Sequence, residues 1–291
     1  MAVYTQKLQL VCDYIQRHLD EDLDVDRLSQ IAALSKFHFH RIFAIHVGLN
    51  VMKFIQLSRL KRASFQLAFE PDLKIIEIAL QAGFDSPEAF TRAFKRSFDQ
   101  TPRAFRDKPD WESWHQKFVF TIPKSELKMN VNIVERPAEK IAYLSHLGSP
   151  DKVLETAAQF IAWRKETGLS PVTKSKTYAI PFADPDQTPA DEFRFDIAGS
   201  IEKAVPENSY GVQTGEIPAG RYATVRHFGS HDQIKDSVYY IFRNWLPEQP
   251  EEAGDYPVFF HYHNFVHEVN ECDLITDMMC AEKTGGFNLV N

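Results

Sequence analysis

The sequence lacks an apolar run of the roughly 18 residues that a membrane-spanning helix needs. Its first residues, MAVYTQKLQLVCDYI, show no basic stretch followed by an apolar core and a small-residue cleavage site, so no secretory signal is expected. Only three cysteines are present, Cys12, Cys272 and Cys280, and none stands in a CxxC spacing. This argues against a disulfide framework and fits the reducing cytoplasm, where we expect the protein, with no membrane partner.

Several enzyme signatures are missing too. The sequence has no glycine-rich phosphate loop, no GxSxG and no HExxH, so we expect neither an enzyme nor a cofactor. The segment HYHNFVH carries His261, His263 and His267, of which the first two would share one face of a strand. Three such imidazoles could form a zinc site. Because no carboxylate pair is clearly placed to support them, we expect no metal.

Positive charge is scarce overall, since the net charge is −7, but it is unevenly distributed. Residues 1–108 carry 16 Lys and Arg against 13 Asp and Glu, a net of +3, whereas the remainder carries 17 against 27, a net of −10. Residues 27–69 contain no acid. A basic stripe within an acidic protein is typical of one surface that faces phosphates, although a solvated helix face gives the same pattern.

The N-terminal part contains a repeat with an offset of 51 residues. Its shared pattern, S-x3-F-x-R-x-F, places Ser35, Phe39, Arg41 and Phe43 on Ser86, Phe90, Arg92 and Phe94, and Ala32 on Gly83. Each copy follows a short apolar-periodic helix and a tight turn, and each serine can cap the next helix. Helix, turn and helix in succession predict two helix-turn-helix motifs.

Within each second helix the two phenylalanines are four residues apart and share a buried face. Arg41 and Arg92 stand two residues after the first phenylalanine, about 200° around the helix, so they point outward. An exposed arginine near the start of a recognition helix can bind guanine in the major groove. Between the copies, residues 51–69 form a helical pattern of roughly 28 Å, close to the ~34 Å between successive major grooves. One chain could thus reach two adjacent grooves.

The segment GFDSPEAFTRAFKRSFDQTPRAFR at 83–106 resembles the signature of the AraC/XylS family of transcription regulators, and SKFHFHRIF at 35–43 resembles its first recognition helix. The resemblance covers about residues 5–107. It implies that one helix faces bases, that the second faces another groove, and that Lys95 approaches phosphate. Glu88 and Ala89 are poor donors for base reading, so the second helix is expected to discriminate less. The predicted DNA-binding residues are Lys36, Phe37, His40, Arg41, Ser86, Glu88, Thr91, Arg92 and Lys95.

A second repeat lies in the C-terminal part, after a linker at 109–128 in which Trp111, Trp114 and Phe118 suggest docking. ERPAEKIAYLSHLGSPDKV at 135–153 matches EIPAGRYATVRHFGSHDQI at 216–234 with an offset of 81. Strands at 193–199 and 274–280 fit the same offset, with Asp196 on Asp277, and helices are expected at about 150–166 and 231–247. Two β-β-α-β-β halves predict an antiparallel α+β sheet with helices on one face and a cleft between the halves.

This part resembles the GyrI-like, or effector-binding, domain in IAYLSHLG, GRYATVRHFG, NWLPEQP, FFHYHN and ECDLITDM, over about residues 129–283. The resemblance implies an aromatic cleft for small, often cationic or drug-like molecules, frequently with a buried glutamate. Phe260 stands where many relatives have an acid, which leaves a neutral ligand open. Aromatic residues on strands can equally be plain core. The predicted effector-binding residues are Tyr143, Trp163, Tyr222, Phe260, Tyr262 and Glu271.

The sequence therefore predicts a multidomain protein. An all-α double helix-turn-helix DNA-binding domain at 1–108 precedes the linker, and a duplicated α+β effector-binding domain occupies 129–291. The expected function is a transcription regulator that binds double-stranded promoter DNA, senses a small-molecule effector and acts on RNA polymerase. Two alternatives remain: a hydrolase or sequestering domain attached to a DNA anchor, and a constitutive DNA binder.

Overall fold

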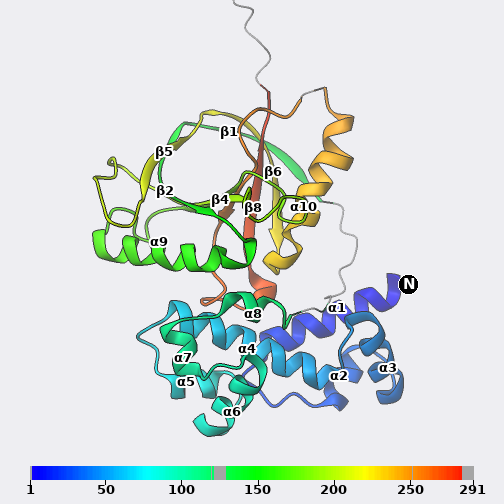
Figure 1. The fold of residues 1–291 in the computed structure, drawn as a ribbon. Coiled ribbons are helices and arrows are strands. Elements are labelled where there is room, and N and C mark those ends of the chain that lie inside the picture. The colour runs from blue at the N-terminus through cyan, green and yellow to red at the C-terminus, as the bar shows by residue number, and fades with distance from the viewer. Residues whose placement is uncertain (1, 119, 121–128, 251, 284–291) are drawn as a thin grey trace, which may run out of the picture. The chain divides into compact units, whose positions relative to one another are not determined.

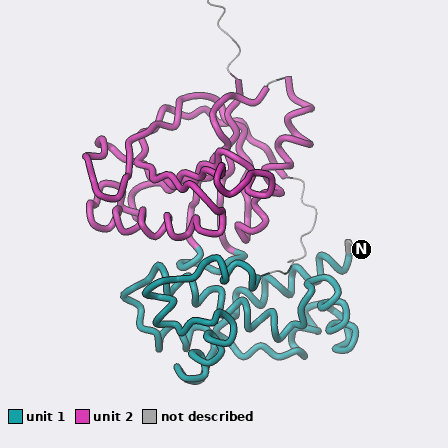
Figure 2. The backbone as a smooth tube through the Cα atoms, viewed as in Figure 1, with its two compact units in different colours: residues 1–127, 266–272 teal, residues 128–265, 273–291 magenta. Residues whose placement is uncertain are grey.

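A computed structural model describes residues 2–118, 120, 129–250 and 252–283 (Figure 1). The chain divides into two compact units (Figure 2). The first, here called the helical unit, comprises residues 1–127 together with the separate segment 266–272. The second, the sheet unit, comprises residues 128–265 and 273–291. Among the described residues, none of the helices has both the length and the hydropathy needed to cross a membrane.

The helical unit contains the two predicted helix-turn-helix pairs and the predicted helix at 51–69, together with further helices that the sequence analysis did not predict. In chain order they are α1 (Ala2–Arg17), α2 (Val25–Ile31), α3 (Lys36–Val47), α4 (Val51–Phe69), α5 (Ile75–Gln81), α6 (Pro87–Phe98), α7 (Pro102–Asp107) and α8 (Trp111–His115). The pairs α2–α3 and α5–α6 are the two helix-turn-helix motifs. The predicted caps are confirmed: the Ser35 side chain accepts from the His38 N–H, and Ser86 from the Ala89 N–H.

The turns of the two motifs differ by one residue. The offset is 50 between α2 and α5 but 51 between α3 and α6, because the second turn has an extra residue before its serine cap. The left-handed position of the first turn is therefore Ala33, with φ +48°, and not Ala32. Its counterpart is Gly83, with φ +68°. The match of Ala32 to Gly83 was wrong because a fixed offset cannot register an insertion.

Phenylalanines form the core of both motifs. Phe39 and Phe43 are fully buried in α3, as are Phe90 and Phe94 in α6, as their spacing predicts. Phe43 packs edge-on against Phe54 of α4 with ring centroids 5.6 Å apart. Buried aromatic rings thus hold α3 against α4, and Phe94 of α6 packs against Phe105 of α7 with ring centroids 5.4 Å apart.

Part of the expected linker belongs to this core. Trp111 and Trp114 of α8 are buried, and their rings lie 6.1 and 5.2 Å from that of Phe65. Phe118 lies 4.5 Å from Trp114, ring to ring. The docking suggested by these aromatics is confirmed, whereas positions 119 and 121–128 of the predicted linker lie outside the described residues.

The sheet unit repeats one strand and helix pattern. Its elements are β1 (Val131–Arg136), β2 (Glu139–Leu147), η1 (Pro150–Lys152), α9 (Val153–Thr167), β3 (Thr177–Pro181), β4 (Arg194–Ser200), β5 (Gln213–Ile217), β6 (Gly220–Phe228), η2 (His231–Gln233), α10 (Ile234–Tyr240), η3 (Ile241–Trp245), η4 (Leu246–Glu248), β7 (Phe259–Tyr262) and β8 (Ile275–Ala281). The short helix η5 (Glu271–Asp273) begins in the segment 266–272 of the helical unit. The predicted offset of 81 relates β2 to β6 and β4 to β8. The predicted duplication is confirmed.

The described strands form one antiparallel sheet of order β1-β6-β8-β7-β3-β4-β2-β5. Each half exchanges an edge strand, since β1 pairs with β6 and β5 with β2. The two halves meet where β3 pairs with β7. The boundary between the two repeats therefore lies at the centre of the sheet, between β3 and β7.

Alternation along the strands separates the two faces of this sheet. On one face Ala142 of β2 packs with Phe160 and Trp163 of α9, and Val225 of β6 packs with Ile241. On the other face Ile141 of β2 joins a cluster of aromatic side chains. The helices cover the first face, as predicted; the opposite one is here called the tyrosine face.

Candidate functional site: recognition helices and the tyrosine face

Helix α3 presents an exposed surface of mixed chemistry. Its predicted DNA-binding residues Lys36, Phe37, His40 and Arg41 are all exposed, and Phe37 keeps 79% of its side-chain surface. Burial of this ring against a partner would contribute about 1.5–3 kcal/mol, so it is available as an apolar contact. Lys36 forms an ion pair with Asp26 of α2. This surface can offer hydrogen-bond donors together with one apolar ring.

Helix α6 presents a more strongly charged surface. Glu88, Arg92 and Lys95 are exposed, whereas Thr91 is half-buried. Ser86, also half-buried, already uses its hydroxyl oxygen as the helix cap. Exposed Arg96 and Arg103 lie nearby in sequence and were missed, although their outward positions follow from the helical period.

Much of the acid-free stripe at 27–69 does not face solvent. Arg59 of α4 donates to the carbonyls of Leu19, at 2.7 Å, and Glu21. Lys61 is buried, and Arg62 donates to Asn270 at 3.3 Å. The interpretation of these α4 cations as phosphate contacts was wrong, because their side chains are used to hold the helical unit together. The cationic surface is narrower than charge counting indicated.

Segment 266–272 explains the burial of Lys61. It belongs to the helical unit although it stands in the chain between β7 and β8 of the sheet unit. Lys61 Nζ lies 2.7 Å from Glu271 Oε1, and His267 lies 3.4 Å from Glu70. Within the helical unit a small pocket is lined by Gln16, Leu19, Ser58, Lys61, Arg62, Phe65, Val266, Val269 and Glu271. The predicted effector glutamate is thus the ion-pair partner of an α4 lysine.

The tyrosine face gathers aromatic side chains from both repeats. Tyr178 of β3 and Phe259 of β7 are equivalent by the offset of 81, and their ring centroids lie 5.8 Å apart. Tyr222 lies 5.5 Å from Phe259, and Tyr256 and Tyr143 border the cluster. This cluster lies where the two halves meet, since β3 pairs with β7 there. The cleft expected between the halves stays a prediction.

The six predicted effector-binding residues are not brought together. Tyr143 and Tyr222 belong to the cluster on the tyrosine face. Trp163 of α9 packs against the helix-covered face of the sheet, while Phe260 and Tyr262 belong to the core beside α10. Glu271 lies in the helical unit. Strand alternation accounts for Phe260 and Tyr262, because neighbouring positions point to opposite faces.

An acid that the sequence did not single out lies at this face. Glu139 accepts hydrogen bonds from the Tyr178 hydroxyl at 2.6 Å, from Arg136 at 2.8 Å and from Lys176 at 2.9 Å. Burial acts to raise the pKa of Glu139, but the bonds from Tyr178 and Lys176 and the nearby cations outweigh it, so this pKa lies below its ordinary value. Glu139 is therefore an ionised carboxylate beside aromatic rings.

The guanidinium of Arg136 lies over two of these rings. Its Cζ is 5.7 Å from the ring centroid of Tyr178 and 5.5 Å from that of Phe259. Burial, followed by the bond to Glu139, raises the pKa of the Tyr178 hydroxyl, which stays protonated and donates. An intramolecular cation thus occupies the aromatic surface and bonds the acid beside it. The repeat could have indicated Tyr178 and Phe259, whereas nothing local marked Arg136 or Glu139.

Comparison with known proteins places both parts among described families. The model of the GyrI-like small molecule binding domain matches residues 129–281, and that of a helix-turn-helix domain matches residues 28–108. Probable transcriptional regulator YgiV of Escherichia coli is 44% identical over 154 residues, which are 53% of this chain and 96% of that protein.

Two further relatives cover the chain differently. Right origin-binding protein of Escherichia coli is 37% identical over 246 residues, covering 80% of this chain and 82% of that protein. The uncharacterized HTH-type transcriptional regulator YbfP of Bacillus subtilis is 41% identical over 103 residues, 35% of either chain. The match to right origin-binding protein is longer than either unit, so it includes residues of both.

Proposed function

Since the chain belongs to the family of GyrI-like small molecule binding domains, we propose that an aromatic cation binds its tyrosine face and changes how its helical unit engages promoter DNA. The AraC-type helix-turn-helix domain at the N-terminus makes the chain a DNA-binding transcription regulator. The class of effector and the route by which it acts are the proposal.

The placement of Arg136 carries the choice of a cation. Its guanidinium already lies over Tyr178 and Phe259 and bonds Glu139. A ligand that combines an aromatic body with a positive charge offers the same two interactions, and its rings can stack further on Tyr143 and Tyr256, which are partly exposed. Binding therefore displaces Arg136 and retains the acid. Glu139 takes the role that was predicted for Glu271.

Segment 266–272 supplies a route to the DNA-binding helices. It follows β7, which carries Phe259, through residues 263–265 and is joined to β8 through residues 273–274. Its Glu271 and Asn270 bond Lys61 and Arg62 of α4, the helix that joins the two motifs. A shift of β7 on effector binding is transmitted along the chain to these bonds. The coupling requires that the effector bind the two arrangements with different affinity.

We propose that the two recognition helices contribute unequally to DNA binding. Phe37, His40 and Arg41 of α3 offer base-reading chemistry, whereas α6 offers Arg92 and Lys95 beside the acidic Glu88. Helix α6 therefore mainly positions the chain on phosphates. RNA polymerase is the proposed protein partner, and the sheet unit acts by binding rather than by turnover, as its resemblance to named regulators supports.

The experiment measures binding of tetraphenylphosphonium, an aromatic cation, to the full chain by isothermal titration calorimetry. Glu139→Gln should weaken binding about tenfold or more, because it removes the negative charge that pairs with the bound cation. Glu135→Gln on β1, an exposed carboxylate, is the matched control and should bind like the unmodified chain. Equal affinity of both variants, or no binding by the unmodified chain, overturns the proposed effector class. Fluorescence anisotropy with promoter DNA, with and without the cation, then tests coupling.

A further inference from the structure

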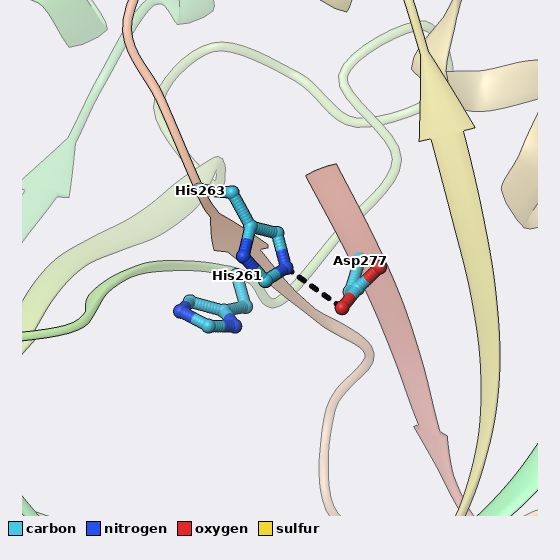
Figure 3. A group of neighbouring side chains, drawn as sticks. All are labelled: His261, His263 and Asp277. Atoms are coloured by element: carbon cyan, nitrogen blue, oxygen red, sulfur yellow. Dashed lines mark hydrogen bonds and ion pairs between the residues drawn. The ribbon is translucent and has the colours of Figure 1, made fainter. Parts of the chain in front are cut away.

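Three side chains with metal-ligating atoms meet on the tyrosine face. His261 of β7 stands directly opposite Asp277 of β8 in the antiparallel register, and His263 follows two residues later. One ligand atom from each lies within 4.8 Å of the others, and Figure 3 shows both imidazoles and the carboxylate grouped together. His267, the third histidine of the sequence triad, lies instead in the helical unit beside Glu70.

We propose that His261, His263 and Asp277 bind a divalent transition-metal ion of the zinc class. Two imidazole nitrogens and one carboxylate oxygen are ligands that such ions prefer, and three protein ligands leave a coordination position for water or a ligand donor. The proposal goes beyond the effector function, since it assigns a second kind of ligand to the same face. No metal was expected from the sequence because Asp277 comes next to the histidines only when β7 pairs with β8.

The duplication shows that the fold does not require these histidines. The offset of 81 places Ile180 and Phe182 at the positions of His261 and His263, while Asp196 stands at that of Asp277. Ile180 pairs with Asp196 across β3 and β4, as His261 pairs with Asp277 across β7 and β8. The first half thus keeps the carboxylate with apolar neighbours. Only the second half adds two imidazoles to it, which points to ligation rather than to folding.

The carboxylate is held in place by a partner outside the group. Arg226 of β6 donates to both oxygens of Asp277, at 2.7 and 2.8 Å, and His263 Nε2 lies 2.7 Å from Oδ2. Groups that hydrogen-bond a ligating carboxylate fix its orientation. Each oxygen has a further lone pair, so the bonds to Arg226 are compatible with ligation. The ion would replace the hydrogen bond between His263 and Asp277.

The imidazole of His261 is placed for ligation by the pairing of its strand. His261 is half-buried on β7 and stands opposite Asp277 of β8, and one of its ring nitrogens lies within 4.8 Å of the ligand atoms of His263 and Asp277. A neutral imidazole has the lone pair that a metal binds. Arg136 and Lys176 oppose a cation here, but both are paired with Glu139. The site therefore depends on direct bonds to the ligands more than on an attractive field.

The test uses the full chain, stripped with a chelator, and Zn²⁺ alone as the probe. Equilibrium dialysis should find one zinc ion per chain that the double variant His261→Ile/His263→Phe no longer binds. This variant copies the residues of the first half, which the fold accepts. The control variant His38→Gln/His46→Gln removes two histidines of α3 and should retain the ion. Asp277→Asn should weaken binding about tenfold or more.

Two results overturn the site. One is the same zinc stoichiometry in the unmodified chain and in the double variant, and the other is no zinc bound by the unmodified chain. Circular dichroism establishes that each variant is folded. Co²⁺ gives a second readout, since its visible absorption should report nitrogen and oxygen ligands in the unmodified chain and lose intensity in the double variant. Tetraphenylphosphonium binding, measured on the same variants, distinguishes failure of the metal site from failure of the effector site.

Discussion

Lys61 and Glu271 form an ion pair of 2.7 Å within the helical unit although 210 residues separate them in the chain. The lysine side chain is 8% exposed and the glutamate side chain 22%. Water therefore screens the pair little, and each charge depends on the other. The pair fixes segment 266–272 to the helix that joins the two recognition motifs, so it is the first contact to test.

Glu271→Gln should destabilise the helical unit by about 1–3 kcal/mol, because it leaves the buried ammonium of Lys61 without its charged partner. Thermal unfolding of the full chain measures this loss. The matched control is Glu252→Gln, whose partner Lys283 is also 2.7 Å away but whose pair is largely exposed. That variant should change stability by less than about 1 kcal/mol. Equal effects of the two variants would show that the Lys61 pair is not a stabilising contact.

A second prediction concerns the stability cost of substituting Gly83 in the turn of the second motif. Gly83 has φ +68°, and a Cβ atom at this residue would lie 2.6 Å from Cζ of Arg59. Gly83→Ala should therefore cost more than Gly48→Ala, where φ is +83° but no atom lies within 4 Å of the added carbon. Both substitutions introduce about 1–2 kcal/mol of backbone strain. Gly83→Ala also displaces the guanidinium of Arg59, so its hydrogen bonds to the carbonyls of Leu19 and Glu21 are lost.

Urea unfolding of the two alanine variants gives the comparison. In an Arg59→Met background the excess cost at Gly83 should disappear, because the displaced guanidinium is absent. An excess that persists in that background would assign it to backbone strain alone. Ala33→Gly in the first turn should instead stabilise the helical unit, because Ala33 has φ +48° and glycine adopts that conformation without the strain of a side chain.

The features that could be predicted from the sequence are local ones. Ser35 and Ser86 cap helices because a serine before a helical period satisfies a free N–H three residues on. Phe39 and Phe43 are buried because spacing by four selects one helix face. The two repeats reported the duplication because they recur at a constant offset. None of these inferences needs to know which distant segments meet.

The features that were missed depend on distant pairing. Lys61 looked like a phosphate contact because its partner Glu271 is remote in the chain. Asp277 could not be joined to His261 before the register of β7 and β8 was known. A one-residue step along a strand separates Phe259, on the tyrosine face, from Phe260, beside α10. Composition and motif spacing do not contain that register.

The sheet unit should lose stability at acid pH as Glu139 becomes protonated. Its folded pKa lies below the ordinary 4.5, because the bonds and charges of Tyr178, Lys176 and Arg136 outweigh burial. A lowered carboxyl pKa contributes stability that is present above the unfolded value and lost as pH falls through the folded one. The stability difference between the unmodified chain and Glu139→Gln should therefore be largest above about pH 4.5 and shrink below it.

Calorimetric melting at a series of pH values from 7 to about 3 checks this, with the difference in Tm as the readout. Glu135→Gln, on exposed β1, should shift Tm little at pH 7 and serves as the control. A difference between Glu139→Gln and the unmodified chain that stays constant down to the lowest pH would contradict the assignment, because an uncharged contact gives no such dependence.

Arg41 and Arg92 occupy equivalent positions in the two motifs, and both are exposed. Arg41→Ala should weaken binding to the cognate promoter by about 1–3 kcal/mol and reduce discrimination against unrelated DNA, because a guanidinium that bonds a base is lost. Arg92→Ala should weaken binding to both DNAs to a similar extent, because a phosphate contact carries no sequence information. Anisotropy titrations with the two duplexes separate these outcomes.

The salt dependence gives an independent measure of the same difference. The DNA affinity of the unmodified chain should fall steeply as the salt concentration rises. Arg92→Ala removes one phosphate contact, so the slope of log affinity against log salt concentration should become less steep by about 1. Arg243→Ala, an exposed arginine of the sheet unit, should leave both affinity and slope unchanged. If Arg41→Ala lowered cognate and unrelated binding equally, α3 would have no greater role in base reading than α6, and the proposed inequality of the two recognition helices would be wrong.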